Sequence, residues 1–152
     1  MLLAAGLGLL TATPASADVT AFLGVSPKPT RQALRGFSFG ITLLVIGFEV
    51  EYANTAERAL DGAAGLATGT INGLVQTPTA NTQFYLTAGG GFFRERLGTD
   101  AQTGFGTNIG GGVKLGLVGP LRLRLDYRVF TLRGRPSSPA PQRLYAGLNL
   151  NF

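Results

Sequence analysis

The feature that most constrains this chain is an alternation of apolar and polar side chains with a period of two residues. In the segment 121–133, apolar residues occupy every second position from Leu121 to Val129. The positions between them carry charge, at Arg122, Arg124, Asp126 and Arg128. Successive side chains of an extended strand point to opposite faces. The pattern therefore predicts strands with one apolar face and one polar face.

Eight segments of this kind follow one another from residue 18 onward. They lie at 18–26, 35–44, 48–52, 65–76, 83–96, 103–117, 121–133 and 142–152. Every proline after Ala17 falls between these segments, as expected of a residue that cannot donate a hydrogen bond to a sheet. Segment 65–76 departs from a clean alternation, because its large apolar residues do not share one face. No segment keeps apolar residues at helical spacing, which excludes a helical bundle.

The connections between the segments alternate in length, which indicates the topology. Those at 44–47, 77–81 and 119–120 are shorter on the whole than those at 26–34, 55–64, 97–102 and 134–141, and the polar stretch 55–64 has room for one helical turn. Short turns at one end and longer loops at the other are typical of membrane barrels. We therefore predict an all-β fold, an eight-stranded antiparallel up-and-down transmembrane β-barrel.

The first 17 residues have the pattern of an export signal. An apolar run from Met1 to Leu10 precedes Ala15-Ser16-Ala17, a small-residue cleavage site. The run is shorter than the roughly 20 apolar residues that a membrane-spanning helix needs. We expect a signal peptide at 1–17, cut after Ala17, and a barrel domain at 18–152.

Composition argues against catalysis and against nucleic-acid binding. Charged residues make up only 14% of the chain, glycine reaches 23 residues, and there is no Cys and no His. The chain therefore lacks thiolate metal ligands, disulfides and the commonest general base. The net charge of +5 comes mostly from scattered arginines, without the lysine runs of a nucleic-acid surface. We expect no enzymatic activity, no cofactor, no metal site and no nucleic-acid partner.

The strands at 83–91, 104–112 and 126–130 and the closing stretch 142–152 carry a family resemblance. In the alternating pattern of its strands, the segment 18–152 as a whole resembles the small eight-stranded outer-membrane β-barrel proteins, the OmpA/OmpX-like outer membrane protein beta-barrel domain family. The resemblance implies a monomer in a bacterial outer membrane, with both chain ends in the periplasm. It also implies a terminal assembly signal, read by the barrel-insertion machinery, at Tyr145, Gly147, Leu150 and Phe152.

If the apolar faces meet lipid, four acidic and four basic side chains point into the barrel. They are Glu49, Glu51, Glu95, Lys114, Arg122, Arg124, Asp126 and Arg128. An eight-stranded barrel is just wide enough for its own side chains, so these charges must pair or form hydrogen bonds. We interpret them as a paired lumen charge network that closes the barrel of a structural or surface-interaction protein. The alternatives are a narrow porin-like channel for ions or small polar solutes, and a soluble periplasmic lipocalin-like barrel with an apolar ligand.

Basic residues also gather near the expected loop ends of the strands. They are Lys28, Arg31, Arg35, Arg58, Arg94, Arg96, Arg133, Arg135 and Arg143. Arginine binds phosphate through a planar fork of donors. We expect Arg94, Arg96 and Arg133 to form a collar that binds the phosphates of lipopolysaccharide. The alternative is a solvated rim that only ends the apolar band.

Overall fold

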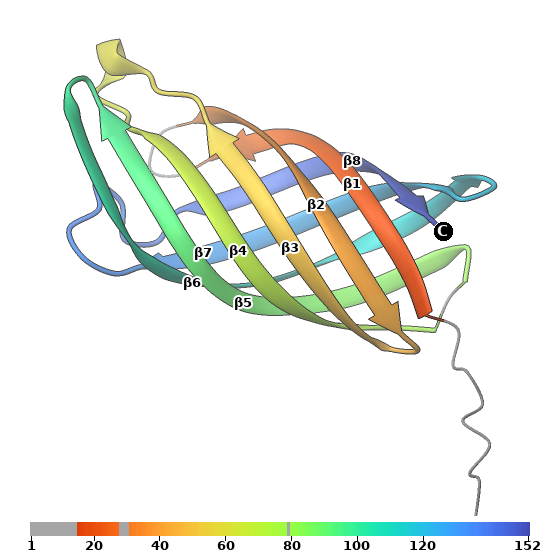
Figure 1. The fold of residues 1–152 in the computed structure, drawn as a ribbon. Coiled ribbons are helices and arrows are strands. Elements are labelled where there is room, and N and C mark those ends of the chain that lie inside the picture. The colour runs from red at the N-terminus through yellow and green to blue at the C-terminus, as the bar shows by residue number, and fades with distance from the viewer. Residues whose placement is uncertain (1–14, 28–30, 79) are drawn as a thin grey trace, which may run out of the picture.

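The chain forms a closed barrel of eight strands, described in a computed structural model for residues 15–27, 31–78 and 80–152 (Figure 1). The strands are β1 (Ala15–Ser26), β2 (Gln32–Leu43), β3 (Ile46–Thr55), β4 (Gly65–Gln76), β5 (Thr82–Leu97), β6 (Asp100–Val118), β7 (Leu121–Leu132) and β8 (Gln142–Asn151). Each strand is antiparallel to its neighbours in the sequence, and β1 closes the ring on β8. The predicted eight-stranded up-and-down barrel is confirmed. Within these residues no helix is long and apolar enough to cross a membrane.

The two ends of the barrel differ in their connections. The terminal end holds both ends of the barrel chain and the connections that follow β2, β4 and β6, and the opposite loop end holds the connections that follow β1, β3, β5 and β7. The connection after β3 contains the expected helical turn, a 3-10 helix η1 at Ala59–Asp61.

Three boundaries differ from the sequence-based expectation. The connection expected at 97–102 is a two-residue turn, because Gly98 adopts a φ of 62° and lets Leu97 pair directly with Asp100. The reversal after β2 also takes two residues, with Leu44 at a φ of 56°. Strand β1 begins at Ala15, inside the predicted signal peptide, of which residues 1–14 lie outside the described part of the chain.

The polarity of the barrel is the reverse of that of a water-soluble domain. Large apolar side chains are exposed on its outer surface, among them Leu23 at 70%, Leu86 at 71% and Phe92 at 69%. Charged side chains are buried inside, with Arg124 and Arg128 both at 0% exposure. Soluble proteins seldom bury such groups or expose so large an apolar area. An outer apolar band around a polar interior matches a barrel in a lipid bilayer.

The mixed pattern of β4 has a simple explanation in this arrangement. Leu66 and Leu74 face the lumen and are buried, whereas Ile71 and Val75 face outward with exposures of 67% and 61%. Apolar residues are therefore present on both faces of this strand. The sequence pattern was ambiguous because part of the lumen is itself apolar.

Glycines on the inner face of β6 make room for large inward side chains of neighbouring strands. A Cβ at Gly112 would lie 2.6 Å from the Tyr85 hydroxyl oxygen, and one at Gly110 would lie 2.7 Å from Cγ of Arg128. A Cβ at Gly104 would lie 2.8 Å from the Phe93 ring. The lumen is thus filled by a few large side chains that lie over bare backbone.

Candidate functional site

The centre of the lumen holds a cluster of five charged side chains from two strands. Strand β7 contributes Arg124, Asp126 and Arg128, and β3 contributes Glu49 and Glu51. In a closed ring of eight strands, β3 and β7 are four strands apart and so lie on opposite walls. All five side chains are at most 2% exposed. The cluster, which we call the strut, therefore crosses the barrel and joins its two walls.

The arginines of the strut hold the carboxylates through several charged hydrogen bonds. Arg124 makes a bidentate contact with Glu49, in which Nη1 donates to Oε2 and Nη2 donates to Oε1 at 3.2 Å. Arg128 donates from Nη2 to the same Oε1 at 2.9 Å and from Nε to Asp126 Oδ1 at 2.9 Å. Its Nη1 lies 3.0 Å from Oε2 of Glu51 without hydrogen-bond geometry. Such charge-assisted pairs stabilise a buried cluster only when their remaining polar atoms also find partners.

Hydroxyl groups supply several of those partners. Tyr85 donates to Asp126 and accepts from Nε of Arg124 at 2.8 Å. Tyr145 donates to Glu51 at 3.2 Å, and Ser38 donates to Glu49 at 3.0 Å. The guanidinium of Arg124 also lies over the Tyr85 ring, 4.7 Å from its centroid. The strut and these hydroxyl groups therefore form one connected network of side chains from five strands.

A second charged layer lies toward the terminal end. Lys114 donates to Asp18 at 2.8 Å, and both side chains are at most 6% exposed. Arg122 is half-buried and donates to the neutral Gln83 at 2.9 Å. Asp18 was not among the predicted lumen charges, although this residue shares the inward parity of Thr20.

Toward the loop end, apolar side chains enter the lumen alongside buried polar ones. Two clusters of buried side chains fill it: Phe22, Leu34, Ala53 and Tyr145, and Leu66, Phe93, Phe130 and Leu132. The rings of Phe22 and Tyr145 stack with centroids 4.0 Å apart. The lumen is thus charged at its centre and blocked by rings and aliphatic chains on the loop side.

Arg143 lies near the loop end of β8, as expected, but its side chain belongs to this interior and not to the outer rim. It is 1% exposed, donates to Thr68 Oγ1 at 2.8 Å, and lies 4.4 Å from the centroid of the Phe130 ring. Position 143 has the same parity as the inward residues Tyr145 and Gly147. Parity along β8 therefore sets the direction of this side chain, although it lies close to the strand end.

Glu95 lies apart from the strut, at the mouth of the loop end. It accepts hydrogen bonds from the backbone N–H of Ser137 at 3.0 Å, from the Ser137 hydroxyl at 2.7 Å and from Gln102 Nε2 at 3.1 Å. A hollow of about 240 Å³ beside it is lined by Gln32, Thr55 and Leu66, among others. Its partners are a loop and a neutral amide, so Glu95 holds the connection 133–141 against the mouth.

The residues of the predicted assembly signal divide between the two faces of β8 and its end. Tyr145 and Gly147 face inward, and a Cβ at Gly147 would lie 2.8 Å from that of Phe22. Leu150 and Phe152 face outward at 45% and 66% exposure. The backbone of Phe152 exchanges two hydrogen bonds of 2.8 Å with Ala17.

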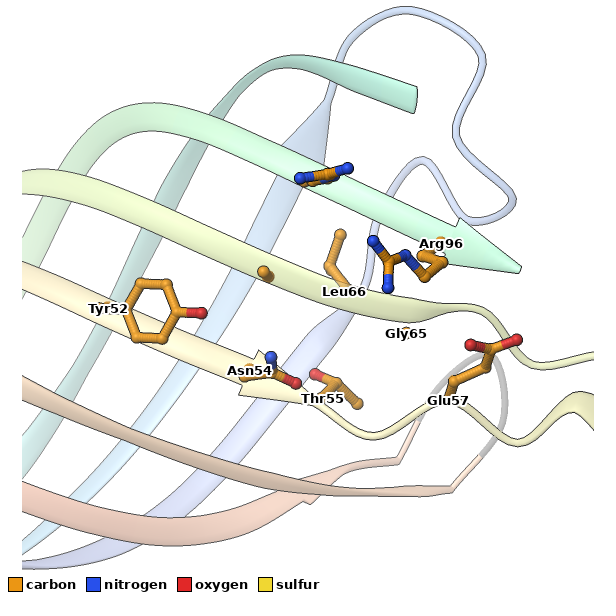
Figure 2. A pocket seen from close by; sticks show the side chains of 9 residues that line it. Tyr52, Asn54, Thr55, Glu57, Gly65, Leu66 and Arg96 are labelled. Carbon is orange, nitrogen blue, oxygen red and sulfur yellow. The ribbon is translucent and has the colours of Figure 1, made fainter. Parts of the chain in front are cut away.

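The predicted collar residues lie on the outer surface at the loop end but do not converge. Arg94 and Arg96 are exposed near the end of β5, beside a groove whose lining Figure 2 shows. Arg133 follows β7 and is paired with Phe105 of β6, so β6 separates it from the other two. In the described ranges, no group of three or more acidic side chains is arranged to hold a metal ion.

Comparison with known proteins places the fold. No protein-family model and no curated protein sequence match this chain. Among solved structures, the Neisserial surface protein A matches with a TM-score of 0.69 and 19% identity, covering 91% of this chain and 96% of that one. The N-terminal β-barrel domain of Pseudomonas aeruginosa OprF matches with a TM-score of 0.68 and 18% identity, and the match covers 90% of this chain and 97% of that domain. At such identities the likeness shows a shared eight-stranded barrel fold.

The same fold also occurs in an enzyme. The outer membrane enzyme PagL matches with a TM-score of 0.51 and 12% identity, covering 88% of this chain and 98% of that one. The barrel by itself therefore does not decide between a catalytic and a non-catalytic role.

Proposed function

We propose that this chain is an integral protein of a bacterial outer membrane with a structural or surface-interaction role and no enzymatic activity. The observation that carries the proposal is the reversed polarity of the barrel, with an exposed apolar band outside and buried charges within. Only a bilayer gives that outer band a favourable environment. The loop end then faces the cell exterior and the terminal end faces the periplasm.

The filled lumen favours a structural role over transport. The strut joins opposite walls at the centre, and the apolar clusters block the lumen on the loop side. An ion entering from outside would have to pass Glu95 at the mouth and then these apolar clusters before it reached the strut. It would also have to break buried ion pairs, which is costly.

The absence of an enzymatic role is supported by chemistry. The sequence has no His or Cys, and the strut carboxylates are held by two arginines that are both fully buried. A carboxylate bound in this way is a poor general base because its charge is already neutralised.

A narrow channel is the second candidate, and one observation favours it. Several buried polar atoms have no partner among the described residues, including Nε and Nη2 of Arg143 and Oε1 of Glu51. Water in the lumen would satisfy these atoms, and a connected file of water would conduct small ions. The lipocalin-like alternative has little support, because a barrel for an apolar ligand needs an apolar interior and this centre is charged.

Export and insertion complete the proposal. The signal peptide at 1–17 would direct the chain to the periplasm, and the insertion machinery would read Tyr145, Gly147, Leu150 and Phe152. A closed ring has no free strand edge, which fits a monomer.

Cleavage after Ala17 would remove the residue whose backbone pairs with that of Phe152. Mass spectrometry of the mature N-terminus should therefore decide between a start at Asp18 and an earlier start.

Cell fractionation tests the proposed location. The full chain, expressed in a Gram-negative host, should sediment with the outer membrane and migrate faster on a gel before boiling than after, as closed barrels do. Recovery of a folded protein in the soluble periplasmic fraction would contradict the membrane role and support the lipocalin-like reading.

Planar-bilayer recording tests the closed lumen. The purified barrel should show little conductance, and Arg124→Gln, which opens the strut, should raise it. A steady, large conductance of the parent protein would favour the channel instead.

A further inference from the structure

The outer wall of the barrel contains a groove along β4 at the loop end. The outward positions of β4 in this region are small residues, Gly65, Ala67 and Gly69. A hollow of about 320 Å³ lies over the first two, with Tyr52 of β3 on one side and Arg94 and Arg96 of β5 in its lining (Figure 2). Below it, a Cβ built on Gly69 would meet no atom within 4 Å.

The groove interrupts an aromatic row on the outer face of strands β2 to β6. The strand register places Phe37, Tyr52, Gly69, Phe92 and Phe105 side by side on neighbouring strands, all facing outward. Phe37 contacts Tyr52 with centroids 5.7 Å apart, and Phe92 contacts Phe105 at 6.0 Å. The two aromatic pairs flank the bare backbone of Gly69. Because β3 and β5 are two strand spacings apart, roughly 10 Å, the gap suits an extended hydrocarbon chain.

The mouth of the groove carries two positive charges without an acidic partner. Arg94 and Arg96 are exposed, and neither forms an ion pair within the described residues. The nearby Glu57 also lines the hollow, but its Oε1 accepts the backbone N–H of Gly98 at 2.6 Å. Alternate residues of one strand are about 6.6 Å apart, so both guanidinium groups can reach one phosphate.

The geometry points to a binding site for one phosphorylated glycolipid of the lipid A class. An acyl chain lies along Ala67 and Gly69 between Tyr52 and Phe92, and a glycolipid phosphate accepts hydrogen bonds from Arg94 and Arg96. The choice of a glycolipid rests on the proposed function, which puts the loop end in the outer leaflet where such lipids reside. Arg133 is not part of the site, because β6 lies between it and Arg94.

Two kinds of variant separate the charged and apolar halves of the site. Arg94→Gln with Arg96→Gln removes the phosphate donors, and Gly69→Leu fills the groove at a position with open space around it. The matched controls are Arg35→Gln with Arg133→Gln, which removes two outward charges at the same end, and Thr131→Leu, which adds the same side chain to the outer face of β7.

Native mass spectrometry of the full chain in a zwitterionic detergent measures the binding. Diphosphoryl lipid A should bind the parent with one-to-one stoichiometry. The double arginine variant should bind at least tenfold more weakly, since each charged hydrogen bond contributes about a factor of ten. Gly69→Leu should also lose most of the binding, and both controls should stay within about twofold of the parent, as expected for changes outside the contact. Dephosphorylated lipid and inorganic phosphate alone should bind weakly.

The results that overturn the site are distinct from those that overturn the membrane role. Unchanged binding in the double arginine variant or in Gly69→Leu would refute the site, as would equal weakening in the controls. Phosphatidylglycerol that binds the parent as tightly as lipid A would refute the choice of a glycolipid. Heat-modifiable migration of each variant, measured in the same samples, reports the folded barrel independently of lipid binding.

Discussion

Removal of Arg124 should destabilise the barrel more than removal of Arg122, the charged residue of β7 that lies outside the strut. The strut holds three carboxylates, Glu49, Glu51 and Asp126, against two guanidinium groups. Arg124→Gln removes one of these guanidinium groups and leaves Arg128 as the only strut arginine that pairs with Glu49. Breaking a fully buried ion pair in this way costs about 3–5 kcal/mol of the free energy of unfolding.

The same strand provides a control two residues away. Arg122 also points inward, but it is half-buried and makes one hydrogen bond, to the neutral Gln83 at 2.9 Å. Arg122→Gln should cost only about 1 kcal/mol. Reversible urea unfolding in detergent micelles, followed by gel migration and circular dichroism, measures both differences.

A double variant tests whether the loss arises from the pair itself. Glu49→Gln combined with Arg124→Gln removes both partners, so its cost should fall below the sum of the two single costs by about 1–3 kcal/mol. Equal destabilisation by Arg124→Gln and Arg122→Gln, or additive single costs, would refute the idea of an energetically coupled strut.

Three further predictions concern packing, turn geometry and assembly. Gly112→Ala should lower stability by about 1–3 kcal/mol, because the new Cβ would clash with the backbone oxygen of Leu125 and lie 2.6 Å from the Tyr85 hydroxyl oxygen, whereas Gly69→Ala should be nearly neutral; urea unfolding compares them. Leu44→Asn should raise the unfolding midpoint, since Leu44 has a φ of 56° that costs leucine about 1–2 kcal/mol and suits asparagine better. Deletion of Phe152 should leave unfolded protein in the periplasm, and unchanged heat-modifiable migration in membranes would count against its role in assembly.

Much of the inward and outward orientation could be predicted from the sequence, because parity along a strand is a local property. Arg124 and Glu49 alternate with large apolar neighbours, so their inward direction follows from the pattern alone. Asp18 and Arg143 obey the same rule. They were missed because each lies near a strand end, where apolar neighbours are fewer and the alternation is weaker.

Which side chains meet inside the lumen could not be predicted in this way. The contact between Arg124 and Glu49 joins residues 75 positions apart and depends on closure of the ring, which sets β3 opposite β7. Glu95 finds its partner Ser137 in a loop, whose path leaves no periodic trace in the sequence. The two-residue turn at Gly98 was also missed, because the residues around it gave no clear apolar alternation.

The central claim is that the apolar face of every strand contacts lipid while the strut and the apolar clusters fill the interior. The chain has no tryptophan, so single reporters can be placed by Phe48→Trp, where the native side chain is 62% exposed, and Phe130→Trp, where it is 1% exposed. In vesicles with brominated acyl chains, fluorescence should be strongly quenched for the tryptophan at position 48 and little affected for the one at position 130. Quenching at position 130 but not at position 48, in folded protein, would contradict this orientation of the barrel.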